Sequence, residues 1–392
     1  MKKIHSIIGG EVAPGFEEVK KEFIKNFTKR GELGATCSVY YQGQKVVDLW
    51  GGYRDWKSRL PWKRDTLVMV FSSTKGLAAM TLAVAHSYGW IDYDAPVAKY
   101  WPEFGQEGKK EITIRQLLSH QAGLCALEAP VYVEEMKNLD GVAEKLSRQK
   151  PLWKPGTKHG YHAATLGMYM NELIRRVDPQ NRSLGQFFQE EIAQPLNLEF
   201  YIGLPEEVPD DRIADNKMVV SPRAVFRIPL KMTLRFLNPR AFLYSAFRIP
   251  RGYHPHKRES RSIELPSGNG IGQVRSMARA YGEFATMGAK LKIRKETMEE
   301  LMSLSITPAQ GALDEVLGIP SYYSLGFTKP GPNVSFGTSR SAFGAPGAGG
   351  SFAFADPDKG IGYAYAMSKM NYNLKNDPRE KSLRKALYRC LH

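Results

Sequence analysis

The pattern of hydrophobic and polar positions divides the chain into strand-rich ends and a helix-rich middle. Residues 37–41 and 45–49 are rich in β-branched and aromatic side chains and are separated by a Gln-Gly-Gln turn, which predicts a β-hairpin. Strand-like runs return from Tyr322 and end with residues 361–367. Helices are predicted over residues 75–85, 111–120, 163–176, 276–285, 295–303 and 378–390. This order predicts an α+β fold, in which an antiparallel sheet built from both ends of the chain is flanked by helices and joined by a mainly helical domain.

Capping residues and a change of composition set the expected boundaries. Gly89 follows the helix at 75–85 as a C-cap, and Thr113 precedes the next helix as an N-cap. Residues 205–262 are rich in proline and in basic side chains, which predicts an irregular insertion. We therefore expect a discontinuous α/β domain, formed by residues 1–75 and 265–392, and a mainly helical domain over residues 76–264. The basic, proline-rich insertion at about 205–262 belongs to the helical domain.

Composition narrows the class of protein further. The 392 residues are 42% hydrophobic and 24% charged and include 18 Phe, 19 Tyr and 6 Trp, which excludes a disordered, collagen-like or coiled-coil chain. Three distant cysteines (Cys37, Cys125 and Cys390) without a CxxC pair favour a reducing compartment. A run of about 18 apolar residues is absent, and the apolar start at residues 7–11 is too short for a signal peptide, so we expect a cytoplasmic protein. The eight histidines form no HExxH or HxH pattern, so we expect neither a metal nor a cofactor.

The motif that can carry chemistry is S-x-x-K, since nucleophile-elbow, P-loop and dinucleotide-binding signatures are absent. It occurs three times, at Ser72–Lys75, Ser147–Lys150 and Ser382–Lys385. Only the Ser72 copy follows an apolar strand-like run and opens a helix rich in small residues, whereas the others lie in charged stretches that we expect to be solvated. Positions i and i+3 share a helix face, so Lys75 can reach the Ser72 hydroxyl. The helix start also offers the Ser72 N–H to an oxyanion. On the motif alone, a serine N-cap followed by a surface lysine remains an alternative.

Three longer segments place this motif in a family. They are residues 71–76 (FSSTKG), 89–104 (GWIDYDAPVAKYWPEF) and 114–124 (IRQLLSHQAGL). Their order and spacing resemble the serine β-lactamase and penicillin-binding-protein superfamily, and most of all the class C-related branch that includes the family VIII carboxylesterases. The resemblance covers nearly the whole chain and is weakest over residues 205–262. It implies an α/β domain and an all-helical domain, with the active site in the cleft between them.

The resemblance also implies roles for single residues. Ser72 corresponds to the nucleophile and Lys75 to its partner. Tyr161, in residues 155–163, corresponds to the tyrosine of the second family motif, Y-x-N, and is expected to act as a general base whose pKa a neighbouring lysine ammonium lowers. The asparagine of that motif is replaced by Ala163. His162 is expected to tune Tyr161 or to line the substrate pocket, whereas His120 is expected to be structural.

The third family motif corresponds to the glycine-rich run at residues 343–351. Its usual lysine, histidine or tryptophan is replaced by Ala345, which offers neither a charge nor a hydrogen bond to a substrate carboxylate. Gly347 is expected to let the substrate approach the backbone, and the Ala348 N–H is expected to be the second oxyanion donor.

Together these residues predict a serine hydrolase that cleaves small-molecule carboxylic esters with short acyl chains through an acyl-enzyme on Ser72. The alanines at positions 163 and 345 favour esters over lactams. The first alternative is a β-lactamase or a D-Ala-D-Ala peptidase-like penicillin-binding protein. The second is a catalytically weak scaffold or membrane-surface protein.

The net charge of +15 is concentrated in residues 223–261, which hold ten Lys or Arg and one Glu. Arg223, Arg227, Lys231 and Arg235 recur every four residues between apolar side chains, as in membrane-surface helices, but four prolines interrupt any long helix. This basic stretch could be a solvated surface, a lid over the active-site cleft, or a contact for anionic lipid. Nucleic acid is not expected, because the stretch carries no binding motif. We expect the stretch to border the cleft and to shape the preferred substrate size.

Overall fold

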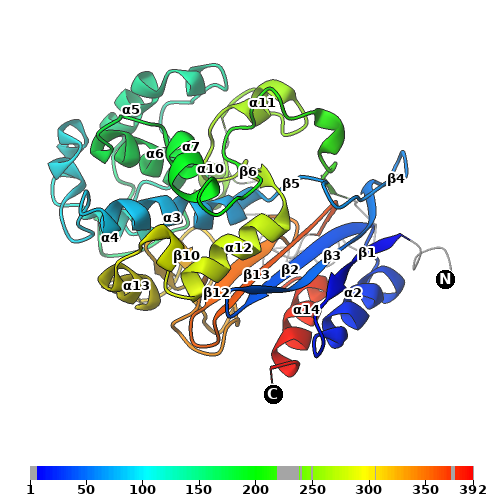
Figure 1. The fold of residues 1–392 in the computed structure, drawn as a ribbon. Coiled ribbons are helices and arrows are strands. Elements are labelled where there is room, and N and C mark those ends of the chain that lie inside the picture. The colour runs from blue at the N-terminus through cyan, green and yellow to red at the C-terminus, as the bar shows by residue number, and fades with distance from the viewer. Residues whose placement is uncertain are drawn as a thin grey trace.

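The computed structural model describes residues 7–218, 238, 241–248, 250–304, 306–371 and 376–391 (Figure 1). The basic residues Arg223, Arg227, Lys231, Arg235 and Arg240 lie outside the described residues, and so does the cationic stripe predicted from them.

One large antiparallel sheet forms the centre of the molecule. Its strands are β1 (Ile8–Val12), β2 (Gly34–Tyr41), β3 (Gln44–Asp55), β4 (Leu60–Pro61), β9 (Tyr323–Ser324), β10 (Phe327–Thr328), β11 (Phe343–Pro346), β12 (Phe352–Asp356) and β13 (Ile361–Met367). The order is β1-β3-β2-β13-β12-β11-β10-β9, and β4 pairs with β3. The predicted hairpin is confirmed as β2 and β3, and its turn residues Gln42 and Gly43 have φ values of 50° and 76°. Because β13 pairs with β2 from Ile361↔Tyr41 to Met367↔Ala35, the sheet joins the two ends of the chain, as the sequence predicts.

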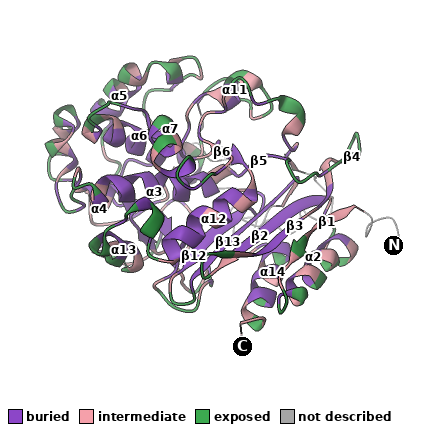
Figure 2. Ribbon diagram, viewed as in Figure 1, coloured by how far each residue is buried: buried purple, intermediate pink, exposed green. Residues whose placement is uncertain are grey.

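The two faces of the sheet carry side chains of different size. On β13, Tyr363 and Tyr365 belong to the core beneath α2 (Glu17–Lys29) and α14 (Pro378–Arg389). The alternate residues Ala364 and Ala366 belong to the larger core on the opposite face, where α12 (Val274–Ala285) packs. Strand alternation produces this division, and the small side chains allow α12 to lie close to the strands. Figure 2 shows the resulting buried layer, with exposed residues on the outer helix surfaces.

The remaining elements form the helical part of the molecule and its connections to the sheet. The helices are α3 (Thr74–Ser87), α4 (Ile114–Leu118), α5 (Leu139–Arg148), α6 (Thr165–Val177), α7 (Leu184–Phe188), α10 (Phe242–Ala246), α11 (Arg258–Ser262) and α13 (Lys295–Met302). Two small sheets pair β5 (Val68–Met69) and β6 (Phe200–Tyr201) with β8 (Ile271–Gly272), and β7 (Lys217–Met218) with β14 (Lys369–Met370). α3 is buried along nearly its whole length and contacts both α6 and the sheet. Thr113 caps α4 as expected, in a capping box with Gln116.

The sequence also predicts that no segment spans a membrane, that the protein is cytoplasmic and that it has two domains. Within the described residues, no helix has both the length and the apolar character needed to cross a bilayer. The cytoplasmic location and the two domain boundaries stay predictions.

Candidate active site

Ser72 lies in a tight turn at the start of α3, a helix that is buried along nearly its whole length. A single 3-10 turn, Phe71–Ser73, leads directly into α3. Phe71 has a φ of 49°, a backbone conformation that residues other than glycine rarely adopt. The strained residue is held because the Thr74 hydroxyl donates to the Phe71 carbonyl at 2.5 Å and accepts from the Gly270 N–H at 2.9 Å. The turn thus leaves Ser72 partly exposed while the rest of the helix start is buried.

Lys75 is buried, and its ammonium group contacts three hydrogen-bond acceptors. Its Nζ atom lies 2.7 Å from the Ala163 carbonyl, 2.7 Å from the Ser267 carbonyl and 3.3 Å from the Ser72 Oγ. Burial lowers the pKa of Lys75 to about 7, because the charged form loses its hydration. A neutral amine has two hydrogens and one lone pair. Since the two carbonyls can only accept, they take the hydrogens, and the lone pair faces the Ser72 hydroxyl. The geometry therefore suits removal of the Ser72 proton.

Tyr161 lies beside this pair, with its ring centroid 5.0 Å from the Lys75 Nζ. The surrounding protein desolvates the phenolate and raises the pKa of Tyr161 to about 12, although a hydrogen bond with Ser72 acts in the opposite direction. The expectation that a lysine ammonium lowers this pKa is therefore wrong, because burial raises the pKa and the opposing effect comes from Ser72 and not from Lys75. A phenol with a raised pKa is a proton donor near neutral pH.

Two pockets meet at Ser72. The larger has a volume of about 190 Å³ and is mostly apolar, and its lining includes Ser72, Met69, Phe71, Ala163, Ala164, Phe247, Tyr253, Pro255, Leu265, Ser267, Gly268 and Ala348. The smaller has a volume of about 60 Å³ and is lined by Ser72, Tyr161, Phe247, Leu317, Tyr323, Thr328, Pro346, Gly347 and Ala348. The described part of the basic stretch, from residue 241 on, supplies Phe247, Tyr253 and Pro255. It therefore borders this site, as the sequence predicts.

The glycine-rich run forms the turn between β11 and β12 and lies against the Ser72 turn. Gly349 and Gly350 have φ values of 81° and 112°, which favour glycine. A Cβ atom on Gly347 would lie 2.4 Å from the Val70 carbonyl oxygen, so only glycine permits this approach. Ala348 is partly exposed in both pockets. Ala345 is buried in β11 and faces Gly76 of α3, so it contributes nothing polar to either pocket.

The two histidines are part of the scaffold around Tyr161. His162 is fully buried; its Nδ1 contacts the Gly160 carbonyl at 2.7 Å, and its Nε2 accepts from the Leu124 N–H at 3.1 Å. It lines neither pocket, contrary to one of the two roles expected for it, because the backbone occupies both ring nitrogens. His120 is buried as well and accepts from the His162 N–H at 3.0 Å, which agrees with its expected structural role. The described residues contain no cluster of three or more His, Cys, Asp or Glu that could hold a metal ion.

The other two S-x-x-K copies lie away from both pockets. Ser147 is 3% exposed and donates to the Glu144 carbonyl, so the expectation of a solvated stretch is wrong there: it lies on the buried face of α5. Ser382 is partly exposed on α14 and donates to the Arg379 carbonyl.

Several residues of the site had no signal in the sequence. The Ser267 carbonyl binds Lys75 through the backbone, which any residue type could provide. Asp314 is fully buried and accepts from the Tyr161 N–H at 3.1 Å, the Leu317 N–H at 2.8 Å and the Tyr323 hydroxyl at 2.6 Å. It therefore fixes the backbone of Tyr161 and the wall of the smaller pocket. Asp314 is far from Tyr161 in sequence and belongs to no recognisable motif.

Comparisons with known proteins agree with this architecture. The β-lactamase family model matches residues 21–388. The chain is 32% identical to an esterase/beta-lactamase, LipL, of Mycobacterium tuberculosis, over 92% of this chain and 83% of that protein. Among solved structures, a family VIII carboxylesterase has a TM-score of 0.87 and 37% identity, covering 98% of this chain and 99% of the other. A penicillin-binding-protein homologue of Caulobacter crescentus has a TM-score of 0.84 and 34% identity, with the same coverage. The family match along almost the whole length, on an α+β fold of this kind, means that the chain belongs to the β-lactamase family.

Proposed function

We propose that the protein is a serine hydrolase that cleaves small-molecule carboxylic esters through an acyl-enzyme on Ser72. The observation that carries this proposal is the pairing of Ser72 with a buried Lys75 whose other two partners are carbonyl oxygens. A serine hydroxyl becomes a good nucleophile only when a base removes its proton, and Lys75 has both the position and the lowered pKa for that role. The esterase relatives support the choice of ester substrates.

The first half of the reaction forms the acyl-enzyme. Ser72 Oγ attacks the ester carbonyl carbon while its proton moves to the Lys75 Nζ. The resulting oxyanion accepts hydrogen bonds from the N–H groups of Ser72 and Ala348. When the carbon–oxygen bond to the alcohol breaks, the Tyr161 phenol donates its proton to the leaving oxygen, and the Lys75 ammonium restores the phenol. Water then attacks the acyl group by the same steps in reverse order and releases the acid.

The two pockets divide the substrate between them. Tyr161 lines the smaller pocket, so the leaving alcohol that it protonates occupies that side. The acyl chain then occupies the larger, mostly apolar pocket. A volume of about 190 Å³ is small compared with the roughly 300–1,000 Å³ of pockets that hold drug-sized ligands, which favours short acyl chains.

The test compares p-nitrophenyl acetate and butyrate with the β-lactam nitrocefin. We expect ester hydrolysis by the wild type and far slower turnover of nitrocefin, because Ala163 and Ala345 provide no polar side chain for a lactam. Ser72→Ala should leave less than about a thousandth of the ester activity. Ser382→Ala is the matched control, since it alters an S-x-x-K serine outside both pockets, and its activity should equal that of the wild type.

Three results would contradict the proposed function, and each would favour a different explanation. Substantial activity in Ser72→Ala would mean another nucleophile. Nitrocefin turnover comparable to that of the esters would favour a β-lactamase. A wild type inactive on all three substrates would favour the scaffold alternative.

A further inference from the structure

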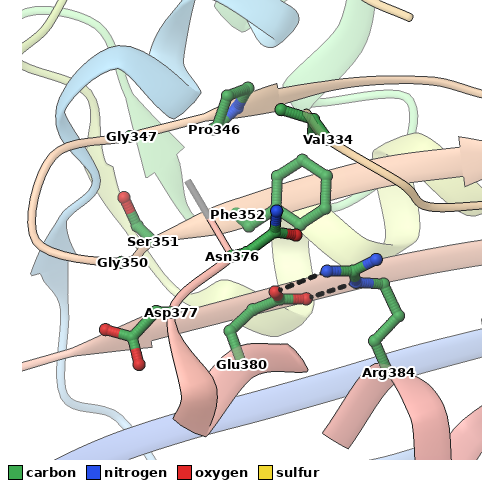
Figure 3. A pocket seen from close by; sticks show the side chains of 10 residues that line it. All are labelled: Val334, Pro346, Gly347, Gly350, Ser351, Phe352, Asn376, Asp377, Glu380 and Arg384. Carbon is green, nitrogen blue, oxygen red and sulfur yellow. Dashed lines mark hydrogen bonds and ion pairs between the residues drawn. The ribbon is translucent and has the colours of Figure 1, made fainter. Parts of the chain in front are cut away.

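A buried pair of serines joins the two turns that carry the proposed oxyanion donors. The Ser351 hydroxyl donates to the Val70 carbonyl at 2.9 Å, and the Ser73 hydroxyl donates to the Ser351 Oγ at 3.3 Å. Both side chains are essentially inaccessible to solvent. Figure 3 shows the turn from Gly347 to Gly350, with the Ser351 side chain inside it.

The Val70 carbonyl oxygen takes part in both turns. It also accepts the Ser73 N–H at 3.1 Å, the hydrogen bond that closes the turn around Ser72. A single carbonyl oxygen is therefore shared between the Ser72 turn and Ser351, which directly follows the glycine turn. The Gly347 N–H donates back to the Ser351 carbonyl at 2.8 Å and closes the second turn on the same residue.

The glycine turn is held from its other side by buried charges. Arg379 donates to the Gly349 carbonyl at 3.2 Å and is itself fixed by Glu32 at 3.0 Å and by Asp377 at 2.8 Å. Asp377 lies beside the turn in Figure 3. A Cβ atom on Gly347 would lie 2.3 Å from the Ser351 Oγ, so the turn packs closely against that hydroxyl and leaves no room for a side chain at this position. With its back fixed by Arg379, the front of the turn is set by Ser351.

We infer that Ser351 is a positioning residue, which keeps the N–H groups of Ser72 and Ala348 directed at the same oxyanion. This inference rests on the proposed function, because the oxyanion exists only if Ser72 attacks an ester. Without the Ser351 hydroxyl, the Val70 carbonyl loses one donor, the Ser73 hydroxyl loses its acceptor, and the two turns are free to separate. Displacements well below 1 Å matter here, since oxyanion donors act only over hydrogen-bond distances.

Ser351→Ala tests this inference with p-nitrophenyl butyrate as substrate. We expect kcat to fall by about tenfold, which is less than the roughly 10²–10³-fold cost of losing an oxyanion donor outright, with KM changed by less than about threefold. The rate at which a fluorophosphonate labels Ser72 should fall in parallel, because that reaction also develops charge on an oxygen in the same place. Ser73→Ala, which removes only the second bond of the pair, should give a smaller decrease. It also provides the measurement if Ser351→Ala does not fold.

Ser38→Ala is the matched control. Ser38 is buried in β2 and donates to the Val47 carbonyl at 2.9 Å, the same kind of bond as that of Ser351, but it is not near either turn. Both variants should lose similar stability, and only Ser351→Ala should lose kcat. A kcat of Ser351→Ala within twofold of the wild type, or an equal loss of kcat in Ser38→Ala, overturns the inference. A wild type that neither hydrolyses the ester nor reacts with the fluorophosphonate at Ser72 overturns the proposed function itself and removes the basis of the inference.

Discussion

In the part of the chain that the structure describes, three lysines are buried against backbone carbonyls, and they differ in one hydrogen-bond partner. Burial lowers the pKa of Lys75 to about 7, of Lys109 to about 8 and of Lys329 to about 7. Lys109 donates to the Ser147 and Gln149 carbonyls, and Lys329 donates to three carbonyls. Only Lys75 has a hydroxyl in place of a further carbonyl. A lowered pKa is therefore not what distinguishes the proposed base. The hydroxyl gives the neutral amine a proton to accept.

The protonation of Lys75 should control the pH dependence of ester hydrolysis. Because the pKa is lowered to about 7, the ammonium form dominates below that pH and cannot accept the Ser72 proton. We expect kcat/KM to rise about tenfold per pH unit on the acid side of pH 7 and to level off above it. Steady-state rates from pH 5 to pH 9 provide the measurement. A profile that is flat across this range would exclude Lys75 as the base.

Replacing Tyr161 by phenylalanine should affect substrates according to their leaving group. The raised pKa keeps the phenol protonated, so its proposed role is to donate a proton to the departing alcohol. We expect Tyr161→Phe to lower the rate on an alkyl ester such as methyl butyrate by at least about a hundredfold. The loss should be smaller on p-nitrophenyl butyrate, whose leaving group departs readily as an anion. Equal losses on both esters would contradict the donor role, and unchanged rates would leave the proton transfers to Lys75 alone.

Among the secondary-structure elements, those with local signals could be predicted and those fixed by distant contacts could not. The β2–β3 hairpin, the capping of α4 and the entry of Ser72 into α3 followed from nearby residues. The helix α2 was missed although its buried residues Val19, Phe23 and Phe27 recur at helical spacing, because charged residues dominate the segment. In the site, Ser72, Lys75 and Tyr161 followed from motifs. The roles of the Ser267 carbonyl and of Asp314 arise from backbone groups and from chain segments that only the fold brings together.

The packing of α3 against α12 and the sheet gives a test at the scale of elements. A Cβ atom on Gly76 of α3 would lie 1.8 Å from the Tyr281 hydroxyl oxygen and 3.1 Å from the Ala345 Cβ. Gly→Ala in a helix usually stabilises by up to about 1 kcal/mol, but here we expect Gly76→Ala to destabilise by about 1–3 kcal/mol through overpacking. Urea unfolding monitored by circular dichroism provides the measurement.

Tyr281→Phe, alone and combined with Gly76→Ala, tests whether the Tyr281 hydroxyl causes this overpacking. Within the described part of the chain, its buried hydroxyl has no hydrogen-bond partner, so Tyr281→Phe should not reduce stability. Because this change removes the atom that a Cβ on Gly76 would meet first, the double variant should be more stable than Gly76→Ala alone. Strictly additive effects would show that the overpacking lies elsewhere.

At the scale of the whole molecule, the two ends of the chain depend on one another. β13 lies between β2 and β12, and α14 packs beside α2, so neither end completes its layer without the other. The connection includes charges: Arg379 of α14 binds Glu32, which lies in the loop between α2 and β2, and both side chains are almost fully buried. The second connection, between Arg389 of α14 and Glu18 of α2, is exposed to solvent. One buried and one exposed ion pair therefore link α14 to the N-terminal part of the chain, and we call this contact between the two ends the junction.

These two ion pairs should differ greatly in their effect on stability. Arg379→Met leaves the Glu32 and Asp377 carboxylates buried without their cation, and we expect it to lower the free energy of unfolding by about 3–5 kcal/mol. Arg389→Met removes an exposed pair between α14 and α2, whose attraction water and salt weaken, so the free energy of unfolding should stay nearly unchanged. Urea denaturation of both variants at low and high salt provides the comparison. Because Arg379 also holds the Gly349 carbonyl, its variant should lose ester activity under conditions where it remains folded, whereas Arg389→Met should keep the wild-type rate. An Arg379→Met variant with the free energy of unfolding of the wild type would mean that the junction is held by its apolar core alone and that the buried charges contribute nothing.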